Sequence, residues 1–229
     1  MAAAFLGILM LDTRFPRPPG DIGCARTFER AGIEVRYLRM QGLGPRRAVQ
    51  ESDEAMVESV TRGALQLERE GAGLVATTCG FLSRYQPHLA RALRVPVITS
   101  SLLQARELPR PGIVTIDQRS LGPAELGGAG VPPGVPVQGV RPGSEFRERI
   151  LGNDPTLDLE LARQDVVEAA RALVEAHPSV RSIVLECTNM PPYRDAVREA
   201  TGRTVVDMET LLLRSWRALG GGAPAGAPG

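Results

Sequence analysis

Two stretches of this sequence match: Leu74-Val75-Ala76-Thr77-Thr78-Cys79-Gly80-Phe81-Leu82 and Ser182-Ile183-Val184-Leu185-Glu186-Cys187-Thr188-Asn189-Met190. In each, a short apolar run ends in a cysteine, a pattern typical of a buried strand followed by a loop. Tyr85 follows Cys79 at the same interval as Tyr193 follows Cys187. These matches indicate that the two halves of the chain are built alike.

A second match lies upstream of each cysteine. Gly7-Ile8-Leu9-Met10-Leu11-Asp12 corresponds to Gly112-Ile113-Val114-Thr115-Ile116-Asp117. Each half therefore contains a strand ending in Asp, a helical region, a strand ending in Cys, a helix and a further strand, in that order. The alternative is that two ordinary β-α-β units share this patterning by chance.

Apolar runs alternate with amphipathic stretches along the chain, which is the pattern of an α/β protein with parallel sheets. We expect two similar three-layer α/β domains related by pseudo-twofold symmetry, with the active site in the cleft between them. The first domain would cover residues 1–105, with 207–219 packing back on it, and the second would cover 106–206. Residues 220–229, which are all Gly, Ala or Pro, are expected to be a disordered tail. The expected strands are 5–11, 33–38, 73–77, 95–99, 112–116, 136–140, 181–186 and 203–207. The expected helices are 48–70, 81–93, about 101–107, 160–176, 190–200 and 209–218.

The composition excludes several classes of function. All 27 basic residues are arginine, so the chain lacks the lysine that pyridoxal phosphate or a nucleotide-binding P-loop requires. A formal net charge of +1 argues against nucleic-acid binding. No apolar run approaches the ~20 residues that a membrane span needs. His88 and His177 have no partners at metal-ligand spacing, so we expect no metal and no cofactor.

The cysteine pair points to proton transfer. Cys79 and Cys187 are both expected at carboxyl ends of parallel strands, where functional groups gather beside the following helices. A helix N-terminus there would lower the pKa of a thiol. Two thiols facing one cleft could remove a proton from one side of a carbon and return it on the other. Thr78, Gly80, Thr188 and Asn189 flank the sulfurs and would supply hydrogen-bond donors. The alternative reading is that both cysteines are small apolar core residues.

Together with the opening segment 7–17, the two cysteine stretches resemble the aspartate/glutamate racemase superfamily, over the chain to about Leu219. That superfamily includes aspartate, glutamate and hydantoin racemases, arylmalonate decarboxylase and maleate isomerase. The resemblance implies a metal-free and pyridoxal-free isomerase with Cys79 and Cys187 as its two bases. It places Thr13, Gly80, Phe81 and Thr188 where the family binds the substrate carboxylate, and Asp12 where glutamate racemases keep an acidic residue. Asp12 is equally suited to capping the turn that follows it.

Departures from the family pattern narrow the expected function. Asn189 stands where glutamate racemases have a histidine, and Gly80-Phe81 where they have Asn-Thr, which argues against a cell-wall glutamate racemase. Arg17 in the first loop could meet a second substrate carboxylate or could simply be solvated. Cys24 has no counterpart in the repeat and is expected to be a bystander.

These features predict a racemase or epimerase of an amino acid or related carboxylate. A decarboxylase, a cis–trans isomerase and a non-catalytic small-acid binding protein are the alternatives. We expect a cytoplasmic protein with a small carboxylate as substrate and with no nucleic-acid or membrane partner. A homodimer is left open.

Overall fold

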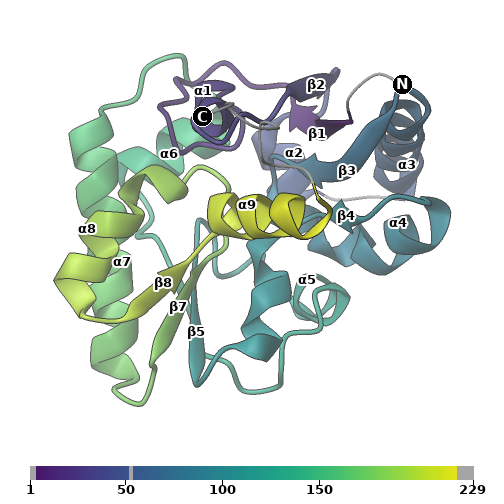
Figure 1. The fold of residues 1–229 in the computed structure, drawn as a ribbon. Helices are drawn as coiled ribbons and strands as arrows, with labels where there is room; N and C mark the ends of the chain where they lie inside the picture. The colour runs from purple at the N-terminus through teal and green to yellow at the C-terminus, as the bar shows by residue number, and fades with distance from the viewer. Residues whose placement is uncertain (1–3, 52–53, 221–229) are drawn as a thin grey trace, which may run out of the picture.

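The computed structural model describes residues 4–51 and 54–220, and within them the chain forms two parallel four-stranded sheets (Figure 1). The first sheet has the order β2-β1-β3-β4 and the second the order β6-β5-β7-β8. If the strands are numbered from the first strand of each half, the two sheets have the same strand order. The predicted fold class, α/β with two similar parallel sheets, is therefore confirmed.

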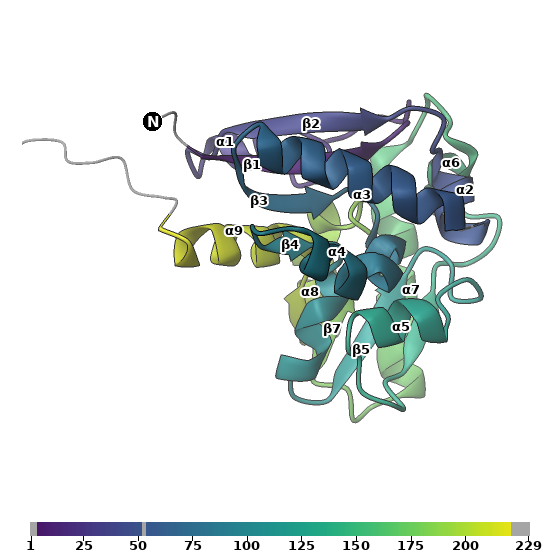
Figure 2. The same ribbon diagram turned by 90° about the vertical axis from the view of Figure 1, so that its right-hand side faces the viewer.

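All eight predicted strands are present among the described residues; β1 has the predicted ends, and no end of the others is shifted by more than two positions. They are β1 (Phe5–Leu11), β2 (Val35–Met40), β3 (Ala72–Thr77), β4 (Val97–Ile98), β5 (Pro111–Thr115), β6 (Val137–Gly139), β7 (Ser182–Leu185) and β8 (Thr204–Val206). Every paired strand within each sheet is parallel. Helices connect the successive parallel strands (Figure 2).

The helices of the described chain differ more from the prediction. They are α1 (Arg26–Glu29), α2 (Pro45–Gln50), α3 (Glu54–Arg69), α4 (Gln86–Ala92), α5 (Pro123–Gly128), α6 (Glu145–Gly152), α7 (Leu159–Ala176), α8 (Arg194–Thr201) and α9 (Met208–Ala218), with the 3₁₀ helices η1 (Gly80–Tyr85), η2 (Ser101–Glu107) and η3 (Pro191–Tyr193). The single helix predicted over 48–70 is wrong. The chain starts α2 earlier, at Pro45, and leaves helical geometry at Glu51 (φ −127°, ψ 22°) before α3 begins.

The first sheet has apolar side chains on both faces, and protein covers each face. Phe5, Leu9 and Leu11 of β1 belong to the core cluster that extends into the second half. Leu6 and Ile8 point to the other face, into a cluster that contains Trp216 of α9. A strand places successive side chains on opposite faces, so such a strand reads as one continuous apolar run. The C-terminal helix thus packs against the first sheet.

This packing brings α9 back to the first half although it follows β8 in the chain (Figure 1). Asp207 caps α9 by accepting from the Thr210 N–H at 2.8 Å, and its backbone oxygen accepts from Gln104 Nε2 at 3.0 Å. The division into domains 1–105 and 106–206 stays a prediction. Of the predicted tail, residues 221–229 lie outside the described chain. None of the described helices has the length and apolar character needed to span a bilayer.

Candidate active site

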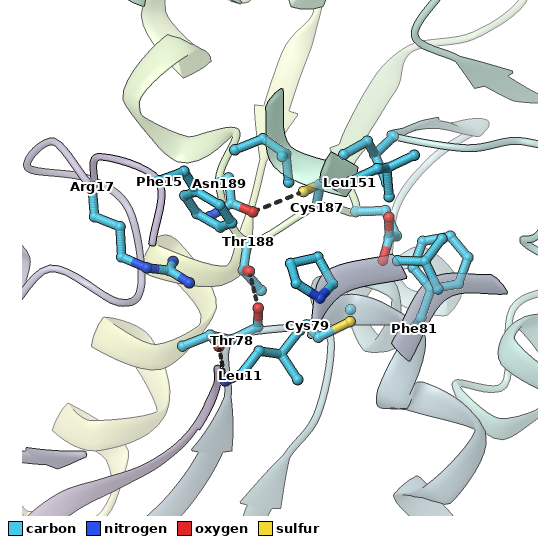
Figure 3. Close-up of a pocket in the computed structure, with 16 residues that line it drawn as sticks. Leu11, Phe15, Arg17, Thr78, Cys79, Phe81, Leu151, Cys187, Thr188 and Asn189 are labelled. Atoms are coloured by element: carbon cyan, nitrogen blue, oxygen red, sulfur yellow. Dashed lines mark hydrogen bonds between the residues drawn. The ribbon is translucent and has the colours of Figure 1, made fainter. Parts of the chain in front are cut away.

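Cys79 and Cys187 occupy equivalent places in the two sheets. Cys79 follows β3 and Cys187 follows β7, each the strand that pairs with the first strand of its half. Both side chains are buried, at 6% and 7% exposure, and both line one cavity (Figure 3). The sequence repeat therefore brings two thiols to one cavity from two different sheets.

The cavity comprises about 340 Å³ of space not filled by protein atoms, part of it open to solvent. Its walls are mainly apolar, and the polar groups gather around the two sulfurs (Figure 3). Eight residues that the sequence singled out line it: Arg17, Thr78, Cys79, Gly80, Phe81, Cys187, Thr188 and Asn189. Eight others were not anticipated: Leu11, Phe15, Pro45, Val49, Ile116, Ile150, Leu151 and Glu186.

Two predicted site residues are not among those that line the cavity. The Asp12 carboxylate accepts from the Gly42 N–H at 3.1 Å and from Arg39 at 3.4 Å, and it is partly exposed. Both partners lie far along the chain, in β2 and in the turn after it, so this geometry is not the predicted cap of the turn that follows Asp12 either. Thr13 is buried, and its Oγ1 accepts from the Arg17 guanidinium at 2.9 Å. Thr13 therefore touches a residue of the cavity rather than the cavity itself.

The two cysteine segments are tied directly to each other. Thr188 donates through Oγ1 to the backbone oxygen of Thr78 at 2.7 Å, across the boundary between the halves. Thr78 in turn accepts on its own Oγ1 from the Leu11 N–H at 3.0 Å. Each threonine adjoins a cysteine, so these buried bonds fix the separation of the two segments and with it the relative positions of the thiols.

The first loop, residues 12–25, is fastened to the Cys187 segment by a chain of side chains. The Cys187 thiol donates to Asn189 Oδ1 at 3.4 Å, and Asn189 Nδ2 donates to Asp21 Oδ2 at 2.7 Å. Asp21 Oδ1 accepts from Arg17 at 2.6 Å. The Ile22 N–H also donates to the Thr188 backbone oxygen at 3.2 Å. The loop of the first half thus closes one side of a cavity that both halves share.

Arg17 lines the cavity and keeps one unused donor beside its ion pair with Asp21. Its guanidinium lies 4.5 Å from the centre of the Phe15 ring, and its side chain is only 8% exposed. Its Nε is buried and, within the described chain, has no hydrogen-bond partner. Since buried donors are nearly always paired, this N–H is a candidate to bind a carboxylate oxygen.

Cys24 lies in the same loop as Arg17 but does not line the cavity.

The expectation that the thiols have lowered pKa values is wrong. Burial and, to a smaller extent, the nearby Glu186 together raise the pKa of Cys79 to about 12, although the backbone N–H groups of Phe81 and Leu82 offset part of the shift. Burial and Glu186 also raise the pKa of Cys187 well above its ordinary value. The N–H groups of the following turn do reach the sulfurs, but in an enclosed apolar site desolvation outweighs them.

Among the lining residues that the sequence did not single out, Glu186 is the one with a titratable side chain. It immediately follows β7 and is completely buried. A signal was available, because a carboxylate at the end of the apolar run Ile183-Val184-Leu185 is unusual: buried acidic residues are rare unless paired.

Gly80 is required by close packing against Glu186. A Cβ at Gly80 would lie 2.1 Å from Glu186 Oε1 and 2.5 Å from its backbone oxygen, and backbone cannot move aside cheaply. We therefore expect Gly80→Ala to destabilise the protein by about 1–3 kcal/mol, as overpacking does. Urea unfolding would measure this. Gly127→Ala is the matched control, because a Cβ there meets nothing within 4 Å, and equal stability of the two variants would contradict the prediction.

The comparisons with known proteins agree with this architecture. Residues 44–215 match the family model described as Asp/Glu/Hydantoin racemase. Among curated proteins, the chain is 29% identical over 239 residues to dimethylsulfoniopropionate lyase 5 of Emiliania huxleyi (strain CCMP1516), a match covering 92% of this chain and 44% of the relative. The chain thus spans less than half the length of that relative.

Solved structures of the same fold include enzymes of different activities. The Gly74Cys mutant of arylmalonate decarboxylase superimposes with a TM-score of 0.64 at 20% identity, over 98% of this chain and 97% of that one. Glutamate racemase from Thermus thermophilus superimposes with a TM-score of 0.58 at 20% identity, over 97% and 84%. At this level of identity the likeness shows the fold alone.

Proposed function

Because this chain belongs to the Asp/Glu/hydantoin racemase family, we propose that it is a cofactor-independent racemase or epimerase acting on a carbon next to a carboxylate. Cys79 and Cys187 would be its two acid/base groups. The observation that carries the proposal is that both thiols line one cavity from equivalent positions of the two halves. A single site with two bases on opposite sides is what inversion of a stereocentre requires.

The proposed reaction moves two protons. The thiolate of one cysteine takes the α-proton and becomes a thiol, which leaves an enediolate-like carbanion on the substrate. The thiol of the other cysteine then gives its proton to the opposite face and becomes a thiolate, so the enzyme ends the cycle with the two roles exchanged. Burial, which raises both thiol pKa values, makes the thiolate a stronger base and thus suits it to a weakly acidic C–H bond.

Substrate binding is proposed for the polar groups around the sulfurs. Arg17, through its unpaired Nε–H, and the segment Thr188-Asn189 would hold the carboxylate. Phe81 and the other apolar walls favour a substrate whose side chain is less polar than that of aspartate or glutamate. Asp12 and Thr13 would contribute only indirectly. The cytoplasmic location, the absence of nucleic-acid and membrane partners, and a homodimer stay predictions from the sequence.

A lyase is the second candidate, and the named relative favours it. Five curated proteins match, and the matched proteins of Emiliania huxleyi and Durusdinium are all named dimethylsulfoniopropionate lyases. Their substrate carries a carboxylate, and removal of its α-proton would expel dimethyl sulfide from the neighbouring carbon. Such a reaction begins with the same proton abstraction but needs a single base rather than two.

One assay tests both candidates. The protein would be incubated in heavy water with a panel of amino acids, hydantoins and dimethylsulfoniopropionate. Racemisation predicts deuterium at the α-carbon with inversion, whereas the lyase predicts release of dimethyl sulfide. Iodoacetamide should block either activity. The proposal is wrong if no compound of the panel gains α-deuterium and no dimethyl sulfide is released. It is also wrong if activity survives the loss of both thiols.

A further inference from the structure

Glu186 lies inside the cavity, and the two-thiol reaction does not use it. It immediately follows β7, immediately precedes Cys187, and is 0% exposed. One carboxyl oxygen, Oε2, accepts from Thr115 Oγ1 at 2.8 Å. The other, Oε1, is buried and has no hydrogen-bond partner in residues 4–51 and 54–220. A buried carboxyl oxygen without a partner in a ligand cavity is a group that awaits a ligand.

The unpartnered oxygen faces the segment of the opposite cysteine. A Cβ built on Gly80 would lie 2.1 Å from Oε1, so this oxygen rests against the backbone of the residue that follows Cys79. The Glu186 side chain thus extends from the end of β7, beside Cys187, to the segment that follows Cys79. It interacts electrostatically with both thiols, and it lines the same cavity as they do.

No cation neutralises Glu186 among the described residues. The titratable groups that act on it or face it are the two thiols and the Glu125 carboxylate, which is paired with Arg84 at 3.2 Å. Arg17 lines the same cavity, but its charge is bound to Asp21. Burial, with a smaller effect of Glu125, raises the pKa of Glu186 to about 8. The carboxyl is therefore mainly protonated at neutral pH and has an O–H to donate.

We propose that Glu186 is a further catalytic residue, which works as a neutral carboxylic acid and donates a hydrogen bond to the substrate carboxylate as negative charge builds on it. This inference rests on the proposed function. A neutral donor stabilises the enediolate, whereas an ionised carboxylate would repel it and would hold the thiols protonated.

In this role Glu186 keeps its proton throughout and only shares it in a hydrogen bond, so the negative charge of the reacting groups stays on a sulfur or on the substrate. Because the carboxyl group interacts with both thiols, the apparent pKa values belong to the three groups together rather than to a single residue.

Two variants test this role. Glu186→Gln keeps the shape, the neutral charge and a donor, so we expect activity in the exchange assay within about tenfold of wild type. Glu186→Leu removes the donor and should lower activity by about 10²–10³-fold, as loss of one such donor does elsewhere. If Gln is as inactive as Leu, the reaction needs an ionised carboxylate and the inference is wrong. If Leu retains wild-type activity, Glu186 has no catalytic role.

A measurement without substrate separates this inference from the proposed function. In the unfolded chain Glu186 ionises near its ordinary pKa of 4.5, but in the folded protein only near 8. Stability should therefore fall as the pH rises between these values, with a slope approaching one proton. In Glu186→Gln this part of the slope should be missing. If urea unfolding gives the same slope for both proteins, Glu186 is ionised when folded and the inference fails, whatever the exchange assay shows.

Discussion

Replacing Cys79 or Cys187 by serine is expected to lower racemisation by about 10²–10⁴-fold, the usual contribution of a positioned acid or base. A serine hydroxyl has nearly the size of a thiol but is far less acidic. It can neither form the anion that removes the α-proton nor give up a proton readily to the carbanion. Both thiols line the same cavity, so each substitution should stop inversion in both directions.

The two variants should still differ from a simply inactive protein. A variant with one remaining thiol can remove and return a proton on its own side, so it should exchange the α-proton of one enantiomer without inverting it. Proton NMR in heavy water, started from each enantiomer separately, would show this. Cys24→Ser is the matched control, because that thiol does not line the cavity, and it should leave the rate unchanged. Full racemisation by either single variant would contradict a two-base mechanism, and loss of activity in only one variant would favour the lyase.

The strands were predictable because their signal is local. Runs such as Ile183-Val184-Leu185 are apolar throughout since both faces of a parallel sheet are covered, and their ends follow from the polar residues beside them. The repeat then predicts the equal strand order, because two halves with the same sequence of elements fold by the same rules.

The short helices were not predictable from periodicity. Helices α1, α5 and α6 contain four, six and eight residues, fewer than a repeating apolar pattern needs to stand out. Local features mark the ends of two of them. Glu125 of α5 accepts from the Gly122 N–H at 3.0 Å, and α6 ends where Asn153 turns left-handed at φ 54°.

The candidate site was predictable only near the cysteines. Residues adjacent to a cysteine in sequence are carried to the cavity by the same strand end. The apolar walls Phe15, Val49 and Ile150 come instead from three segments that meet only in the folded chain. Asp12, by contrast, was predicted at the site but does not line the cavity. Leu11 faces the cavity, and the side chain of Asp12, the next residue, points away from it towards Gly42.

The sign of the thiol pKa shift was missed for an energetic reason. The sequence predicts helix N-termini beside both sulfurs, but Cys79 is followed by the 3₁₀ helix η1, and a turn separates Cys187 from η3. A helix terminus contributes at most about 2 kcal/mol in favourable partly buried geometries. Complete burial of a thiolate costs more than that, and burial cannot be read from a single stretch of sequence.

Asp21→Ala should be the most destabilising of the substitutions considered for the first loop, at about 3–5 kcal/mol. Asp21 and Arg17 form a buried ion pair at 2.6 Å, with side chains 2% and 8% exposed. Removing one partner leaves the other charge buried without compensation. The Gly23 N–H and Asn189 Nδ2, which both donate to Asp21 at 2.7 Å, would lose their acceptor as well.

Urea unfolding of Asp21→Ala and Glu34→Ala would check this. The Glu34–Arg36 pair is 2.8 Å long, but its side chains are about half exposed, and an exposed pair is worth only about 0–1 kcal/mol. Equal losses in the two variants would mean that the loop is not held by its buried charges. Because Asn189 accepts from the Cys187 thiol, freeing Asn189 from Asp21 should also reduce racemisation. Asp21→Asn, whose side chain keeps one acceptor oxygen, should recover part of both losses, because that oxygen can accept from Asn189 Nδ2 and preserve the link between the loop and the Cys187 segment.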